Sequence, residues 1–211
     1  MNLSTHQEIT RIIEDAEPGK LLFPTDFRGK GSEAAIKMAL SRLVKEGKIE
    51  RLAHGIYMLA KYHPDMGKLQ PSLDEIAKAI ANREHIRIRP SGAYALNKLG
   101  LSNQIPTKLV YITDGQARQI RIGKGGIKFK PTTPKKFGMI GEISGLLIQA
   151  LEELGPRQIK PDMLNKIKDL LRKEDPKNLD HDIKLAPAWI NDFFMSINLN
   201  KKINDCVVKI K

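Results

Sequence analysis

The chain has 211 residues, of which 36 are lysine or arginine and 24 are aspartate or glutamate, and its formal net charge is +12. No run of about 18 apolar residues occurs, and residues 1–16 carry acids where a secretion signal needs an apolar centre, so we expect a cytoplasmic protein without a membrane span. The single Cys206 excludes an internal disulfide, and the five histidines lack the spacing of ligand pairs. We therefore expect no structural metal and no cofactor.

The first predicted element is an amphipathic helix over residues 7–16. Its apolar side chains fall on one face at helical spacing: Ile9, Ile12, Ile13 and Ala16. A turn at Gly19 and a short element at residues 25–27 follow.

A well-bounded helix is predicted between Ser32 and Gly47. Ser32 can accept a hydrogen bond from the free amides of the first turn, and glycine is the preferred residue just beyond a helix end. The predicted buried stripe consists of Ile36, Leu40, Leu43 and Val44. The opposite, solvent-facing side then carries Ala34, Met38, Ser41, Arg42 and Lys45.

Residues 48–52 and 56–59 predict a β-hairpin with His54 and Gly55 at its tip and Arg51 at its base. The order of helix, turn, short element, helix and hairpin predicts a winged helix-turn-helix that binds double-stranded DNA, with an inverted repeat as the expected operator. A helix and hairpin of an ordinary α/β core is the alternative interpretation. The residues expected at the groove are Ser32, Lys37, Met38, Ser41 and Arg42, and those expected at phosphates are Arg28, Lys30, Arg51 and His54.

A linker of turn-forming residues, 62–71, predicts a boundary between a DNA-binding domain at residues 1–65 and an α+β domain with a helical C-terminal region at residues 71–211. Ser72 and Glu75 form a capping box that begins a helix ending near Asn82. Residues 85–89 alternate apolar with basic residues, which predicts a strand that ends at Pro90 and exposes Arg87 and Arg89.

The elements that follow are a helix from residue 91 to Gly100, a buried strand at 109–113, and a hairpin of residues 119–122 and 127–130. The glycine-rich residues 123–126 lack the spacing of a phosphate-binding loop and are interpreted as the hairpin turn. Residues 143–154 and 163–171 predict two helices, onto which the apolar residues Trp189, Ile190, Phe193 and Phe194 of the tail dock.

The middle of the chain carries most of the excess positive charge. Residues 71–140 contain thirteen lysines and arginines and four acids, whereas the segments on either side are close to neutral. The predicted partner-binding surface comprises Arg87, Arg89, Arg118, Arg121, Lys124, Lys128 and Lys130. Charge alone leaves DNA and an acidic protein open as the partner.

A weaker alternative is a metal-dependent nuclease. Asp162, following Pro161, and the segment from Asp182 to Lys184 copy the carboxylates that hold Mg²⁺ and the lysine that steadies the attacking water. However, Asp162 stands at a predicted helix start, where a capping role is expected, and Asp182 falls in a proline-rich tail without strand periodicity. We therefore expect a protein that binds and does not catalyse.

Several segments resemble AbiEi-type antitoxins. Residues 23–27, 31–32, 39–43, 47–51 and 55–57 are similar to that family's N-terminal winged helix, and residues 90–92, 95–102 and 111–115 are similar to the body that follows it. The resemblance implies an antitoxin of a type IV toxin-antitoxin (abortive infection) system, which represses its own operon and counteracts a nucleotidyltransferase-like toxin. The toxin or its target would be the second partner. A stand-alone winged-helix transcription factor is the alternative.

Overall fold

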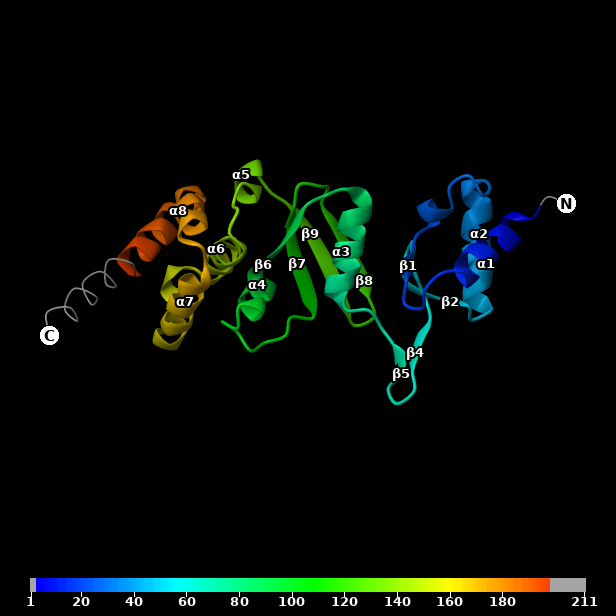
Figure 1. Ribbon diagram of the computed structural model, residues 1–211, viewed down its shortest axis with the longest axis horizontal. Helices are drawn as coiled ribbons and strands as arrows, with labels where there is room; N and C mark the ends of the chain where they lie inside the picture. Colours follow the sequence, from blue (N-terminus) through cyan, green and yellow to red (C-terminus); the bar gives the residue numbers. More distant parts are fainter. Residues whose placement is uncertain (1–2, 198–211) are drawn as a thin grey trace, which may run out of the picture. The chain divides into compact units, whose positions relative to one another are not determined.

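The computed structural model describes residues 3–197, which form a mixed α+β fold with a helical C-terminal part, as predicted. Two compact units are distinguished (Figure 1). The first comprises the described chain up to Arg83 together with Ile120–Gly126, and the second comprises Glu84–Gln119 and the described chain from Ile127 onward. The predicted domain limits, 1–65 and 71–211, stay a prediction, and Cys206 lies outside the described residues. Within residues 3–197, no helix is long and apolar enough to cross a bilayer.

The first helix, α1 (Thr5–Glu14), begins two residues earlier than predicted. Ser4 Oγ accepts from the Gln7 amide, and Gln7 Oε1 accepts from the Ser4 amide at 2.9 Å. This reciprocal cap fixes the start of the helix ahead of the first buried residue, Ile9, from which the apolar periodicity is read.

Three short strands form an antiparallel sheet in the order β1-β3-β2: β1 (Leu21–Leu22), β2 (Ile49–Ala53) and β3 (Ile56–Leu59). The hairpin of β2 and β3 was predicted, whereas β1 was not, because two residues show no alternation. β1 is followed by the 3-10 helix η1 (Pro24–Phe27) and by α2 (Glu33–Lys45). α1 and α2 lie side by side (Figure 1) and enclose a core with Ile9, Phe27 and Leu40.

The segment predicted as an irregular linker is instead a second hairpin. β4 (Lys61–His63) pairs with β5 (Gly67–Leu69), and both strands are largely exposed, so no pattern of buried residues marks them in the sequence. Glu50 on β2 anchors the hairpin, since its Oε2 lies 2.6 Å from Lys68 Nζ and accepts from Gln70 at 2.9 Å. The next helix, α3 (Leu73–Glu84), begins at the predicted capping box of Ser72 and Glu75.

A four-stranded sheet of order β6-β7-β9-β8 follows, formed by β6 (Ile88–Ser91), β7 (Lys108–Thr113), β8 (Arg118–Ile122) and β9 (Gly125–Pro131). The prediction of a strand at residues 85–89 is wrong by three residues, and Pro90 lies inside the strand rather than ending it. Among residues 3–197, β6 is an edge strand that pairs only with β7, and a residue without an N–H is tolerated there.

The helices of the second unit are α4 (Gly92–Lys98), α5 (Pro134–Phe137), α6 (Glu142–Leu154), the 3-10 helix η2 (Pro156–Gln158), α7 (Pro161–Lys173) and α8 (Pro176–Leu185). Residues 188–197 are also helical. α6 packs on α4, α7, α8 and β6. As predicted, the tail contributes Ile190 and Phe194 to this core, but residues 182–184 lie in α8 and not in an irregular tail.

Candidate nucleic-acid interface

The bounds of α2 are those predicted. Ser32 caps its N-terminus, with Oγ accepting from the Ala35 amide at 3.2 Å. Gly47, just beyond its C-terminus, has φ of +72°, a conformation that glycine adopts without strain. Both determinants are local, so the helix starts and ends where the sequence indicates.

One face of α2 is buried and the other is open to solvent. The buried residues, which pack toward α1, η1 and β2, are Ile36, Ala39, Leu40 and Leu43. Val44, predicted in this stripe, is only half-buried. All five residues predicted to face a groove are exposed: Ser32, Lys37, Met38, Ser41 and Arg42. Met38 is 57% exposed although it is apolar, which is suited to contact with a thymine methyl group.

The loop that leads into α2 places cations near the start of the helix. Arg28 and Lys30 are exposed on either side of Gly29, whose φ is +85°. Lys30 Nζ lies 3.9 Å from Glu8 Oε2, a long ion pair, and Arg28 forms none with a carboxylate of residues 3–197. Because the N-terminus of a helix carries partial positive charge, these cations and the first turn of α2 together favour an anion such as a phosphate.

The β2–β3 hairpin offers two more donors near its tip, because Arg51 lies opposite Tyr57, two residues before the end of β2, and not at the base of the hairpin as predicted. Arg51 and His54 are both exposed, and Arg51 Nη2 lies 3.0 Å from His54 Nδ1. A guanidinium has no acceptor, so Nδ1 accepts and the proton of the neutral ring sits on Nε2. The tip therefore presents a charged guanidinium and an imidazole N–H, both of which can donate to phosphate oxygens.

The cations of α2 differ in whether they form an ion pair with a carboxylate. Lys37 Nζ lies 2.7 Å from Glu33 Oε1, one turn earlier in the helix, and this hydrogen bond is the main reason why the pKa of Glu33 lies below its usual value. DNA would have to compete with Glu33 for Lys37. Arg42 and Lys45 both lack a carboxylate partner among residues 3–197, and of the two Arg42 carries the guanidinium that can form two parallel hydrogen bonds with a guanine edge.

Gly31→Ala is expected to destabilise the first unit by about 1–3 kcal/mol, more than Gly29→Ala. A Cβ at Gly31 would lie 2.4 Å from Thr5 Oγ1, and the residue has φ of +149°. Gly29 also has positive φ, but a Cβ there meets nothing within 4 Å, so only backbone strain is expected. Urea unfolding of the two variants measures the difference, and an equal loss in both would contradict the close packing of this loop on α1.

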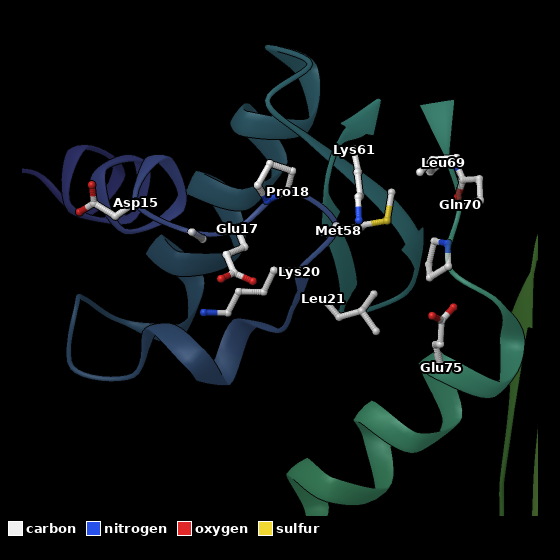
Figure 2. A pocket seen from close by; sticks show the side chains of 13 residues that line it. Asp15, Glu17, Pro18, Lys20, Leu21, Met58, Lys61, Leu69, Gln70 and Glu75 are labelled. Carbon is white, nitrogen blue, oxygen red and sulfur yellow. The ribbon is translucent and has the colours of Figure 1, made fainter. Parts of the chain in front are cut away.

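A hollow of about 730 Å³ opens between the end of α1, β1, β3 and the segment from β5 to the start of α3 (Figure 2). Its charged side chains have mixed signs and include Glu17, Lys20, Lys61 and Glu75. Glu75 is already committed to capping α3 through Ser72. The hollow was not predicted, and its mixed charge does not define a ligand of one kind.

The residues of the predicted basic surface fall into three groups. Arg121, Lys124, Lys128 and Lys130 are exposed and form no ion pair within residues 3–197. Arg87 and Arg118 are exposed but paired, with Asp114 at 2.7 Å and Glu84 at 2.9 Å, respectively. The hydrogen bonds from Arg87 hold the pKa of Asp114 below its usual value.

Arg89 does not belong to this surface, and its predicted exposure is wrong. It is half-buried, and its guanidinium donates to the carbonyls of Lys136 at 3.1 Å and Met139 at 2.9 Å. Burial lowers the pKa of Arg89, while the nearby charge of Asp182 opposes that effect. The shift of β6 by three residues explains the error, because it places Arg89 in the strand opposite Ile112.

The two aspartates of the nuclease alternative lie in different environments. Asp162 is exposed in the first turn of α7, whereas Asp182 is fully buried on α8 and accepts from the Ile140 amide, the Gly141 amide and Ser144 Oγ. Within residues 3–197, no group of three or more potential metal-ligating side chains occurs. Asp182 therefore has a structural role, which no motif of the sequence indicated.

A family model described as a family of unknown function (DUF6088) matches residues 8–179, most of the chain. No curated protein matches the chain. The description of the family names no activity, so the resemblance to AbiEi-type antitoxins stays a prediction.

Proposed function

Since the chain belongs to the DUF6088 family, whose function is unknown, we propose a function from its own residues: it is a DNA-binding transcriptional regulator whose first unit contains a winged helix-turn-helix. The observation that carries the proposal is the exposed polar face of α2, bounded by the cations Arg28 and Lys30 at one end and accompanied by the donor-bearing tip of the β2–β3 hairpin. The protein acts by binding, and no residue is assigned a catalytic role.

The order of elements supports this proposal. α1, η1 and α2 supply the helices, with η1 shortened to a single 3-10 turn, and the hairpin of β2 and β3 follows α2 directly as the wing. β1 pairs with β3 and joins the helical part to the wing in one sheet. In such modules the last helix enters the major groove, so α2 is the helix proposed to contact bases.

The chemistry of the exposed side chains suits a duplex. A major groove is about 12 Å wide and admits one α-helix, and its base edges are recognised by arginine, serine and apolar side chains. Arg42, Ser41 and Met38 supply these three kinds of contact on one face of α2. Arg51 and His54 at the wing tip, and Arg28 and Lys30 at the helix start, are assigned to phosphates, which fix the register without conveying sequence.

Binding of the purified full chain to the DNA upstream of its own gene tests this function. We expect a protected site made of two symmetric halves separated by about one helical turn, as for dimeric helix-turn-helix proteins, and an affinity at least about a thousandfold above that for random duplex at the same salt concentration. Equal affinity for the upstream and random duplexes would contradict the proposal.

The resemblance of residues 90–92, 95–102 and 111–115 to the body of AbiEi-type antitoxins adds a second part to the proposal. This part assigns to the chain repression of its own operon and antagonism of a nucleotidyltransferase-like toxin. Expression of the chain together with a neighbouring nucleotidyltransferase-like gene should restore the growth that the gene alone arrests. Operator binding without such rescue would leave the alternative, a stand-alone transcription factor.

A further inference from the structure

The β8–β9 hairpin lies in a segment that contains only one sign of charge. Residues 115–141 include seven lysines and arginines and no aspartate or glutamate. Five of the seven fall between Arg118 and Lys130, and we call this stretch the cationic hairpin. A surface helix or strand of ordinary composition mixes both signs, so the absence of acids over this length concentrates positive potential on one segment.

Four of the five cations of the hairpin are free to contact a ligand. Arg121, Lys124, Lys128 and Lys130 are exposed, and none of them pairs with a carboxylate among the described residues. Only Arg118 is engaged, by Glu84 and by the ring of Phe129, whose centroid lies 5.6 Å from Arg118 Cζ. A ligand therefore displaces no internal ion pair when it contacts the four free cations.

The strand β9 arranges its two lysines in a row. Ile127 and Phe129 are buried, and Lys128 and Lys130 alternate with them on the exposed face. Alternate residues of a strand lie about 6.5 Å apart. Two ammonium groups in line along a strand suit a ligand that itself carries a row of negative charges, and they are ill suited to a single small anion.

The surroundings of these cations favour a duplex over other polyanions. The aromatic residues of the segment are Phe129, which is buried, and Phe137, which is half-buried and lies under the Arg87 guanidinium. Single-stranded nucleic acid is bound by stacking bases on exposed aromatic rings, and such rings are lacking in residues 115–141. Protein partners need an apolar centre, and no large apolar side chain is exposed between Arg118 and Pro131.

We infer that the cationic hairpin is a second DNA-binding surface, one that contacts the phosphates of double-stranded DNA without regard to sequence. The inference goes beyond the proposed function, because it does not use α2 and does not depend on an operator. A surface of this kind raises affinity for any duplex and releases counterions from it, so its contribution is measured as salt dependence.

The test compares two matched pairs of neutralised lysines in the full chain, using a random-sequence DNA duplex as the ligand. Lys128→Gln with Lys130→Gln should reduce the slope of log affinity against log salt by about 2, since each phosphate contact contributes about 0.9. Lys173→Gln with Lys177→Gln, which removes the same charge from exposed, unpaired positions of α7 and α8, should leave the slope unchanged. Arg121→Gln with Lys124→Gln is a second hairpin variant, in case the first fails to fold.

Each remaining outcome overturns the inference. An unchanged slope in both hairpin variants, or an equal fall in the control, shows that the hairpin does not contact DNA. If a single strand of the same length binds with equal affinity, and the hairpin variants lower its salt slope by the same amount, the hairpin is a general polyanion-binding surface. If the hairpin variants lose toxin antagonism but bind random duplex as the wild type does, the partner of the hairpin is a protein. Failure of the proposed function gives a different result, namely no preference for the upstream DNA over the random duplex.

Discussion

Replacing Asp182 with alanine is expected to lower the free energy of unfolding of the second unit by about 3–5 kcal/mol. The carboxylate is fully buried and accepts from the Ile140 amide at 2.8 Å, the Gly141 amide at 3.0 Å and Ser144 Oγ at 2.6 Å. Its removal leaves two buried donors, the Gly141 amide and Ser144 Oγ, and one partly buried donor, the Ile140 amide, without this acceptor. A buried donor without an acceptor costs about 1–3 kcal/mol. Urea unfolding followed by the fluorescence of the single tryptophan, Trp189, measures the loss.

Asp180→Ala is the matched control, because Asp180 lies in the same helix and is exposed. It should change the unfolding free energy by no more than about 0.5 kcal/mol. Similar effects of the two substitutions would contradict the central position that the structure gives Asp182.

The contribution of Asp182 should also depend on pH. Burial acts to raise its pKa, but the hydrogen bonds from Ser144, His181 and the Ile140 and Gly141 amides outweigh burial, so the pKa of Asp182 lies below the usual 3.8. A carboxyl group whose pKa is depressed by folding stabilises the protein above its unfolded pKa, and this stabilisation is lost as the pH falls through the folded pKa. The stability difference between the wild type and Asp182→Asn should therefore be constant near neutral pH and shrink below about pH 4. A difference that stays constant down to pH 2 would contradict the assignment.

Arg42→Ala is expected to weaken binding to the upstream DNA by about 1–3 kcal/mol, which is roughly five- to 150-fold, if Arg42 contacts a guanine edge as proposed. Arg42 is exposed on α2 and has no competing carboxylate among the described residues, so its whole hydrogen-bonding capacity is available to a base. Binding to random duplex should change much less. Titration of both duplexes at fixed salt concentration gives the two values.

Lys30→Ala tests the other class of contact. Because Lys30 is assigned to a phosphate, its loss should weaken binding to both duplexes alike and reduce the salt slope by about 1. Arg172→Ala, an exposed change of the same charge on α7, is the control and should affect neither. Equal loss of specific and random binding in Arg42→Ala would remove Arg42 from base recognition.

Elements whose determinants lie close together in the sequence were predicted well. α2 is bounded by Ser32 and Gly47, and α3 begins at the box of Ser72 and Glu75, all through hydrogen bonds or backbone angles that span a few residues. The alternation of Ile127 and Phe129 with two lysines likewise marked the exposed side of β9. A cap or an alternation acts over one turn or a few strand residues, so it is visible before the chain folds.

The elements that the sequence did not predict are formed by residues that lie far apart in the chain. β1 exists because Leu21 and Leu22 pair with Met58 and Tyr57, and the exposed β4–β5 hairpin is anchored by Glu50. Neither pairing has a local signal.

The sequence by itself therefore determined the helix of the candidate interface, the polarity of its two faces, the excess of positive charge in the middle of the chain and the helical character of the C-terminal part. Only the tertiary structure decided which charged residues are free. Arg89 is half-buried because its guanidinium donates to the carbonyls of Lys136 and Met139, and Asp182 is buried against the start of α6. A charged side chain is buried only where partners from distant segments satisfy it, and those partners come together only when the chain has folded.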